Sequence, residues 1–460
     1  MQFNFSSLNL GCTKNLVDTQ FLLWKFFELW WNNKNYNLNY FTDPFEKNVE
    51  FVFLNTCGFI SSGRQEMFET IQKLLKKNKK IYLLWCGLQY FLWKNLKDEK
   101  KEKWETKIFD ELVQNKNIFF LSWEDFEKIT IQDLVKWYSS KKFDDFKYVD
   151  NSRAYTNSAY GFEYLKIAEW CNNNCSFCII PKIRGKQKSL PMEKIIDEVT
   201  NMVKFWIKEI IFIAQDSTRY WIDLYWKPSL FELLKKIDKI PWKFMYRILY
   251  LYPDVVTLKQ LKNLTKLKKF IPYFDIPLQH ISSPVLKRMW RFYDEKYIYN
   301  FLDFINKNFK TKFIRTNLII WFPWETEKDF KALCEFVQKY RFDNIALFEY
   351  HDEPLAQSSK LDWKINYHLI HKRFIKLKKL IEKLKIETWK DDGQNFIQQW
   401  FVMGFKNKSV KSWKSVKSVV RPWLNAPEID PYVEIDQNKI ISVNWKKNYK
   451  QINIWDLVVY

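Results

Sequence analysis

Residues 164–191 read YLKIAEWCNNNCSFCIIPKIRGKQKSLP and place three cysteines, Cys171, Cys175 and Cys178, on one short loop. The loop directly follows an apolar, strand-like run, EYLKIAE. Three thiolates this close can bind three irons of a cubane cluster, whereas such clusters are normally held by four cysteines. The fourth iron would then be open to a substrate or cofactor. The alternative is a zinc loop or three buried thiols, but zinc sites usually show paired C-x2-C spacing or a nearby histidine.

A second set of three cysteines is spread over the first 90 residues. The runs NFSSLNLG, EFVFLNTCG and KIYLLWCG are short and apolar, and Cys12, Cys57 and Cys86 lie at or just past their ends. Stretches with helical spacing separate the runs, which predicts a parallel α/β domain. Because the carboxyl ends of parallel strands share one edge of a sheet, we expect these cysteines to meet in a second three-cysteine site. The alternative is three ordinary buried cysteines, which are common in strands.

From residue 164 onwards strands and helices alternate again. The predicted strands are EYLKIAE, EIIFIAQD, FMYRILYLY, YFDIPLQ, FIRTNLIIW and NIALFEY. Six such units predict a partial (β/α)6 barrel with its chemistry at the carboxyl ends of the strands. We therefore divide the chain into an N-terminal α/β domain (1–140), a polar linker (141–163), the barrel (164–390) and a β-rich tail (391–460).

Composition limits the class of protein. The chain has 460 residues, seven cysteines and a net charge of +22, and it has no apolar run of 18 residues and no signal-peptide pattern. We expect a cytoplasmic protein without a membrane partner, because cysteines in sets of three suit metal–thiolate chemistry in a reducing compartment. The positive charge favours a nucleic-acid or ribosomal partner. A genome rich in A/T codons, which favours lysine, would explain it equally well.

The motifs resemble those of radical S-adenosylmethionine (SAM) methylthiotransferases along almost the whole chain. The resemblance is strongest to the branch that modifies an aspartate of a small-subunit ribosomal protein (the RimO type). It rests on LNLGCTKNLVDTQ, FLNTCGFI, IAQDSTRY, DLYWKP, ILYLYPD, DIPLQHISSPVLKRM and NAPEID. The resemblance implies that the tail is a TRAM-like β-barrel, and we expect it to be truncated after Tyr460. A sister branch (the MiaB type) modifies tRNA adenosines and shows other motifs at these places.

The resemblance also implies cofactors, partners and site residues. Cys171, Cys175 and Cys178 would hold the radical 4Fe–4S cluster and bind SAM, and Cys12, Cys57 and Cys86 would hold an auxiliary 4Fe–4S cluster. The residues expected to line SAM are Gln215, Asp216, Arg315 and Glu325. The implied partners are ribosomal protein S-twelve, free or on the ribosome, and a reductant such as flavodoxin or ferredoxin. Two alternatives are a tRNA methylthiotransferase, with tRNA as its partner, and a non-catalytic iron–sulfur or RNA-binding paralogue.

Glycine and tryptophan are present in unusual numbers. The chain has 8 Gly and 23 Trp, whereas ordinary usage predicts about 32 Gly in this length. Tryptophan stands where the resembled family has glycine at Trp85, Trp170, Trp206, Trp221, Trp226, Trp321 and Trp324. We hypothesise that most of these positions are glycine in the cell, encoded by UGA codons that the organism reads as glycine. The alternative is a drifting, inactive paralogue that tolerates tryptophan.

Overall fold

The structure is a computed structural model that describes residues 2–32, 37–92, 103–121, 161–340, 342–362, 367–392, 399–407, 416–422, 426, 433–436, 440–444, 449–452 and 458–459. The chain divides into two compact units. The first contains Met1–Thr156, Glu169–Lys188 and His351–Leu361, and the second contains the remaining residues. Most of the predicted linker lies outside the described residues. No helix in the described part of the chain is long and apolar enough to cross a membrane.

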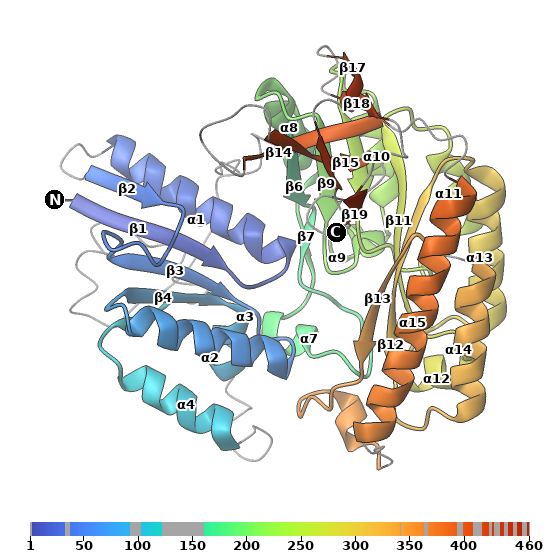
Figure 1. Cartoon of the computed structure of the whole chain (residues 1–460), viewed down its shortest axis with the longest axis horizontal. Coiled ribbons are helices and arrows are strands. Elements are labelled where there is room, and N and C mark those ends of the chain that lie inside the picture. The colour runs from blue at the N-terminus through green and yellow to red at the C-terminus, as the bar shows by residue number, and fades with distance from the viewer. Residues whose placement is uncertain are drawn as a thin grey trace. The chain divides into compact units, whose positions relative to one another are not determined.

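The first unit is built on a five-stranded parallel sheet with the order β2-β1-β3-β4-β5 (Figure 1). Its strands are β1 (Gln2–Asn9), β2 (Asn37–Phe41), β3 (Phe51–Thr56), β4 (Lys80–Trp85) and β5 (Ile118–Leu121). Helices α1 (Thr13–Asn32), α2 (Ser61–Leu75), α3 (Cys86–Leu92) and α4 (Lys103–Gln114) connect them. Every residue of β3 is buried, as expected of a strand covered on both faces.

A buried ion cluster fastens a distant segment to the first unit. The Nε atom of Arg64 lies 2.7 Å from Glu105, and its Nη2 atom lies 3.0 Å from Glu353, a residue far along the chain. The ring of Tyr90 stacks 4.1 Å below the guanidinium. The Arg64 side chain is completely buried, and its Nη1 atom also donates to the carbonyl of Gly58 at 3.2 Å.

The second unit contains a six-stranded parallel sheet with the order β13-β12-β11-β10-β9-β6. Its strands are β6 (Phe162–Lys166), β9 (Glu209–Ile213), β10 (Met245–Ile248), β11 (Phe270–Gln279), β12 (Phe313–Ile320) and β13 (Asn344–Glu349). All six predicted strands are therefore confirmed, in one parallel sheet. The order follows the sequence from edge to edge, as in a partial (β/α) barrel.

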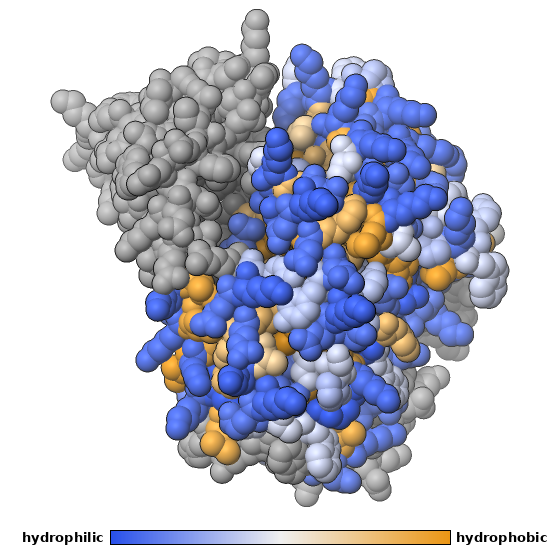
Figure 2. All heavy atoms as spheres, turned by 90° about the vertical axis from the view of Figure 1, so that its right-hand side faces the viewer, coloured by the Kyte–Doolittle hydropathy of each residue, from blue (hydrophilic) through white to orange (hydrophobic). Residues whose placement is uncertain are grey.

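Helices alternate with these strands. They are α8 (Met192–Lys204), α9 (Ile222–Tyr225), α10 (Leu230–Asp238), α11 (Leu258–Leu264), α12 (Ser283–Arg288), α13 (Glu295–Asn308), α14 (Glu327–Tyr340) and α15 (Tyr367–Asp392). Helices α13, α14 and α15 lie on the outer side of β12 and β13 (Figure 1). Hydrophilic side chains predominate on this face of the molecule, and hydrophobic ones are scattered (Figure 2).

The tail forms an antiparallel sheet with the order β17-β18-β14-β15-β16-β19. Its strands are β14 (Gln399–Asn407), β15 (Val416–Pro422), β16 (Val433–Asp436), β17 (Ile440–Asn444), β18 (Tyr449–Ile452) and β19 (Val458–Val459). The predicted change from α/β to β structure is thus confirmed. So is the α/β class of the chain.

Candidate functional site

The auxiliary cysteines lie where three neighbouring strands end. Cys12 follows β1, Cys57 follows β3 and Cys86 follows β4, and these strands are adjacent in the sheet. The Sγ atoms of Cys12 and Cys86 each lie 3.7 Å from the Oδ1 atom of Asn15. The structure therefore brings the side chains of these two cysteines to one amide group at the expected edge of the sheet.

Two residues that sequence analysis missed complete this edge. Arg184, on the short helix α7 (Ile180–Arg184), places its Nε atom 2.9 Å from Cys86 Sγ and its Nη2 atom 2.6 Å from Asn15 Oδ1. Asn15 also donates to the carbonyl of Thr56 at 2.9 Å. The only sequence signal for Arg184 was its position six residues after Cys178. No spacing rule links it to a residue 98 positions earlier.

The three thiols have different acidities. Burial raises the pKa of Cys57 to about 11, with a further contribution from Cys86. Burial also raises the pKa of Cys86, although the charge of Arg184 opposes it. Burial acts on Cys12 in the same direction, but the charges of Lys14 and Arg184 outweigh it and lower its pKa. Without a metal cation this site favours neutral thiols at two of its three positions.

Glycines leave room beside these thiols. A Cβ atom on Gly58 would lie 2.2 Å from the carbonyl oxygen of Cys86, and one on Gly63 would lie 3.3 Å from Cys57 Sγ. Among the described residues, no three His, Cys, Asp or Glu side chains form a closed metal-binding group. The fit to an iron–sulfur cluster therefore rests on the donors: three thiols at one sheet edge, glycine beside them, and a buried cation for charge balance.

The second cysteine set lies on the loop that begins after β7 (Ala168–Glu169). Cys171 and Cys175 are buried and Cys178 is partly buried. The backbone N–H of Cys178 donates to the carbonyl of Cys175 at 3.0 Å, and the N–H of Gln187 donates to Asn172 Oδ1 at 2.9 Å. These bonds fold the loop back on itself. Its exit is fixed by Ile179 and Ile183, which pack in the core of the first unit.

Two of the predicted SAM residues, Gln215 and Asp216, follow β9 in the second unit. The Oε1 atom of Gln215 is buried and has no hydrogen-bond partner in the described part of the chain. Buried polar atoms are almost always paired, so an orphaned acceptor indicates room for a donor from a ligand. Asp216 instead accepts from the N–H of Thr218 at 3.0 Å and lies 3.3 Å from Arg219 Nε. It therefore caps the turn η3 (Ser217–Arg219).

Arg315 and Glu325, the other two predicted SAM residues, are occupied by internal contacts. Arg315, on β12, donates to Asp275 Oδ1 at 2.7 Å. Glu325, in the turn after β12, accepts from the N–H of Trp321 at 2.6 Å and lies 3.4 Å from Arg373. Both contacts are structural, so a role for either residue in cofactor binding stays a prediction. These residues belong to the second unit, whereas all six cluster cysteines belong to the first.

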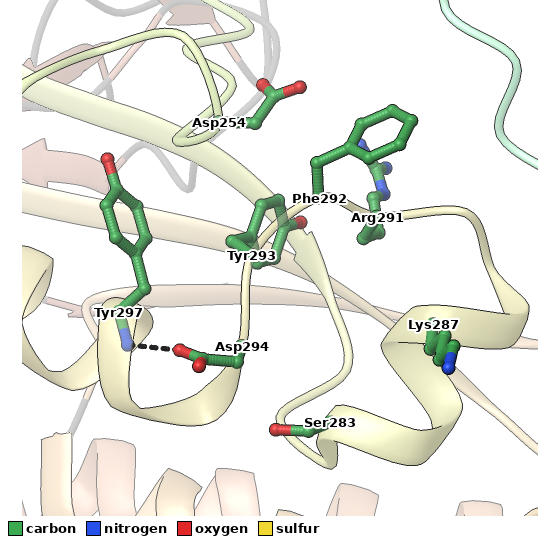
Figure 3. A pocket seen from close by; sticks show the side chains of 8 residues that line it. All are labelled: Asp254, Ser283, Lys287, Arg291, Phe292, Tyr293, Asp294 and Tyr297. Carbon is green, nitrogen blue, oxygen red and sulfur yellow. Dashed lines mark hydrogen bonds between the residues drawn. The ribbon is translucent and has the colours of Figure 1, made fainter.

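The second unit also has a pocket of about 480 Å³ (Figure 3). Its lining includes Asp254, which follows β10, and Lys287 and Arg291 from the region of α12. Charges of both signs therefore face a space past the carboxyl ends of β10 and β11. None of the four predicted SAM residues lines it. Arg219 links this pocket to the end of β9, because it lies 2.9 Å from Asp254, which lines the pocket, and 3.3 Å from Asp216.

Two family models match different parts of the chain. Residues 165–337 match the family model described as Radical SAM superfamily. Residues 4–104 match the model described as Uncharacterized protein family UPF0004. Among solved structures, a radical SAM methyltransferase, TsrM from Kitasatospora setae, aligns with a TM-score of 0.48 at 10% identity, covering 75% of this chain and 72% of that one.

Curated relatives match nearly end to end. Ribosomal protein uS12 methylthiotransferase RimO of Alkaliphilus oremlandii is 34% identical, over 95% of this chain and 93% of the relative. The protein of the same name from Dictyoglomus thermophilum is 33% identical, over 95% of this chain and 94% of the relative. Identity at this level along the whole length confirms the resemblance found in the motifs. The chain belongs to the family of ribosomal protein uS12 methylthiotransferases.

Proposed function

We propose that this protein is a radical SAM methylthiotransferase that adds a methylthio group to the β-carbon of an aspartate in ribosomal protein uS12. The observation that carries the proposal is the match to RimO proteins over 95% of the chain. Free uS12 or the ribosome is the proposed partner, with flavodoxin or ferredoxin as reductant. The reaction would take place in the cytoplasm.

The proposed cofactors are two 4Fe–4S clusters and SAM. When bound, they supply the radical, the sulfur and the methyl group. Cys171, Cys175 and Cys178 would hold one cluster and leave an iron open for SAM, and Cys12, Cys57 and Cys86 would hold the other. The buried Oε1 atom of Gln215 would accept a hydrogen bond from SAM.

Parts of this chain would also shield and orient the reaction. Cys171, Cys175 and Cys86 are at least nine-tenths buried, which limits access of water to the iron ligands. The cation of Arg184 at Cys86 offsets the negative charge that thiolate ligands bring. On the second unit, the Arg315–Asp275 pair holds β12 and β11 in register at the core of the sheet.

The proposal is tested by incubating the anaerobically reconstituted protein with SAM, a reductant and either uS12, intact small subunits or tRNA. We expect mass spectrometry to find one added methylthio group on an aspartate of uS12. The group should be absent when Cys12, Cys57 and Cys86 are replaced by Ala. A methylthio group on tRNA adenosine alone would favour the sister branch, and cluster binding without transfer to any of these would favour a non-catalytic paralogue.

A further inference from the structure

Arg184 belongs by sequence to one cysteine set and by contact to the other. It follows the loop of Cys171, Cys175 and Cys178, yet its Nε atom lies 2.9 Å from the Sγ atom of Cys86. The side chain is 8% exposed. All of these residues lie within the first unit, so a single segment supplies three thiols to one site and a cation to the other.

The surroundings of Arg184 hold its guanidinium in one orientation. Its Nη2 atom donates to Asn15 Oδ1 at 2.6 Å, its Nη1 atom lies 3.5 Å from Glu169, and Asp18 lies at 4.0 Å. A planar guanidinium keeps its charge and presents its donors in a fixed fork. The Nε–H group is therefore held toward Cys86 Sγ by partners on its other nitrogens.

Hydrogen bonds and positive charge at cluster thiolates have a known consequence. Both stabilise the reduced, more negative cluster and so raise its reduction potential. We propose, resting on the proposed function, that Arg184 is a positioning residue of the auxiliary cluster. It donates an N–H···S hydrogen bond to Cys86, holds Asn15 beside Cys12 and Cys86, and raises the potential of the cluster.

The test compares Arg184→Gln, Arg184→Lys and the matched control Lys182→Gln. The control removes a charge from the same helix, where Lys182 Nζ donates to the backbone carbonyl of Leu355. Each change is made in a full-length chain whose Cys171, Cys175 and Cys178 are Ala, so that only auxiliary iron remains. Iron content, electron paramagnetic resonance and the midpoint potential of the cluster are then measured.

We expect Arg184→Gln to shift the midpoint to a more negative potential, Arg184→Lys to shift it less, and Lys182→Gln to leave it nearly unchanged. If Arg184→Gln loses the cluster, retention of iron in Arg184→Lys supports the same role for the charge. Equal potentials in all three variants, or equal loss of iron in Arg184→Gln and Lys182→Gln, would overturn the inference. A parent chain that binds no iron would instead contradict the proposed function.

A different observation carries a second inference: the backbone at many tryptophans is left-handed. Ten non-glycine residues of the described chain have positive φ angles, from 54° to 73°. Seven are tryptophan: Trp170, Trp206, Trp221, Trp226, Trp290, Trp321 and Trp324. This conformation is uncommon for residues other than glycine and is a genuine outlier for bulky side chains.

Two of these tryptophans end helices in a motif that favours glycine. At the end of α8 the N–H of Trp206 donates to Val203 at 3.1 Å, and the next N–H donates to Met202 at 3.1 Å. At the end of α12 the N–H of Trp290 donates to Lys287 at 3.1 Å, and the next donates to Leu286 at 2.9 Å. Both are Schellman motifs, in which the residue at this position is usually glycine and sometimes asparagine.

A third helix of the same chain shows the ordinary solution. After α2, the N–H of Asn78 donates to Leu75 at 2.9 Å, and that of Lys79 donates to Leu74 at 3.1 Å. Asn78 has a φ of 54°, which asparagine tolerates because its short polar side chain bonds locally. At this third Schellman motif the chain therefore has a residue that tolerates a positive φ, whereas the other two motifs have tryptophan.

A turn in the second unit also has tryptophan at a position that favours glycine. Its four residues are Phe322, Pro323, Trp324 and Glu325, and the N–H of Glu325 donates to the carbonyl of Phe322 at 2.9 Å. Trp324, the third residue, has a φ of 68°. Proline in the second place and positive φ in the third identify a type II turn, whose third residue is normally glycine.

The indole groups contribute little to the core. The side chains of Trp206 and Trp226 are 78% and 91% exposed, and those of Trp290 and Trp324 are about half exposed. Only Trp321 is fully buried, beneath the guanidinium of Arg373. Neither the backbone nor the packing thus accounts for tryptophan at most of these places.

We propose that these seven positions are glycine in the protein as its own organism makes it, encoded by UGA codons read as glycine. The structure adds Trp290 to the positions named from sequence. It leaves out Trp85, which ends strand β4, where the backbone does not require glycine. The proposal restores glycine directly before Cys171 and in the turn at Glu325.

Two measurements test the second inference. The gene should carry UGA at all seven positions, and peptides from the native organism should contain glycine there. In a recombinant chain, changing all seven to glycine should raise the melting temperature by roughly 10 °C or more. Trp24→Gly, inside helix α1, is the control and should lower it. UGG codons, native tryptophan peptides, or a lower melting temperature in the seven-fold variant would each overturn the proposal.

Discussion

The Nε2 atom of His280 lies 3.7 Å from the Oε2 atom of Glu325, and both side chains are completely buried. Burial lowers the pKa of His280 to about 3, so its imidazole is neutral. Burial raises the pKa of Glu325 to about 7, although the N–H of Trp321 and the charge of Arg373 oppose the shift. Near neutral pH the carboxyl group therefore changes charge inside the folded protein.

We predict that Glu325→Gln removes a pH dependence of stability. A carboxyl group with a raised folded pKa stabilises the fold fully below about pH 4.5, and this contribution is lost as the pH rises through 7. Between pH 4.5 and pH 8, the free energy of unfolding of the wild type should therefore fall by about 3 kcal/mol relative to that of the variant. Urea unfolding at several pH values measures this difference, and a difference that is constant with pH would contradict the prediction.

His280→Gln provides the opposite control. A histidine with a lowered folded pKa stabilises the fold above its ordinary pKa of 6.5, and this contribution is lost as the pH falls toward 3. The free energy of unfolding of His280→Gln should therefore rise relative to that of the wild type as the pH falls. If the relative stability of both variants changed in the same direction with pH, the two pKa shifts would be wrong.

We predict that Arg64→Met destabilises the first unit by about 3–5 kcal/mol, because it leaves two buried carboxylates without their cation. These are Glu105 and Glu353, at 2.7 and 3.0 Å. Lys73→Met on the exposed side of the same helix is the matched control and should change stability by about 0.5 kcal/mol or less. Denaturant unfolding of both variants measures the free energy of unfolding. An equal decrease in the two variants would show that the ion pairs of Arg64 do not stabilise the first unit.

We predict about eight irons per chain after anaerobic reconstitution, since each cubane contains four. Alanine at Cys171, Cys175 and Cys178 should leave half the iron and abolish SAM cleavage. Alanine at Cys12, Cys57 and Cys86 should also leave half but retain cleavage. Cys334 on α14 lies outside both sets, so Cys334→Ala should keep all the iron. Retention of eight irons in either triple variant would refute the assignment.

We predict that Gln215→Ala weakens SAM binding by about 3- to 10-fold, the value of one neutral hydrogen bond. The reason is the buried Oε1 atom, which has no partner in the described residues. Equilibrium dialysis against labelled SAM measures the affinity of the reconstituted protein. Gln65→Ala is the control, because Gln65 is exposed and bonds to Glu69. Unchanged affinity in Gln215→Ala would place SAM elsewhere.

Local patterns in the sequence were sufficient to predict most of the fold. Each strand of the parallel barrel sheet is a short apolar run between polar segments. Strands such as β6 and β9, in which every residue is buried, are expected to read this way. The cysteine sets could also be found, because Cys171, Cys175 and Cys178 are close in sequence, and because Cys12, Cys57 and Cys86 follow strands whose ends share one edge. Helix α13 shows the same kind of pattern, because its apolar residues Ile298, Phe301, Leu302 and Ile305 recur at helical spacing and are buried.

Contacts between distant residues were decided only by the tertiary structure. Nothing local in the sequence pairs Arg184 with Asn15 or Arg64 with Glu353, because ion pairs and hydrogen bonds across the core depend on where the chain returns. The family resemblance implied Gln215, Asp216, Arg315 and Glu325 together as SAM residues, and their contacts in the structure differ. The Oε1 atom of Gln215 is buried without a hydrogen-bond partner in the described residues, whereas Asp216 pairs with Arg219, Arg315 with Asp275 and Glu325 with the N–H of Trp321. The residue types in the sequence thus determined which chemical groups the protein has. Burial and pairing in the tertiary structure decided which of those groups are available to bind a ligand.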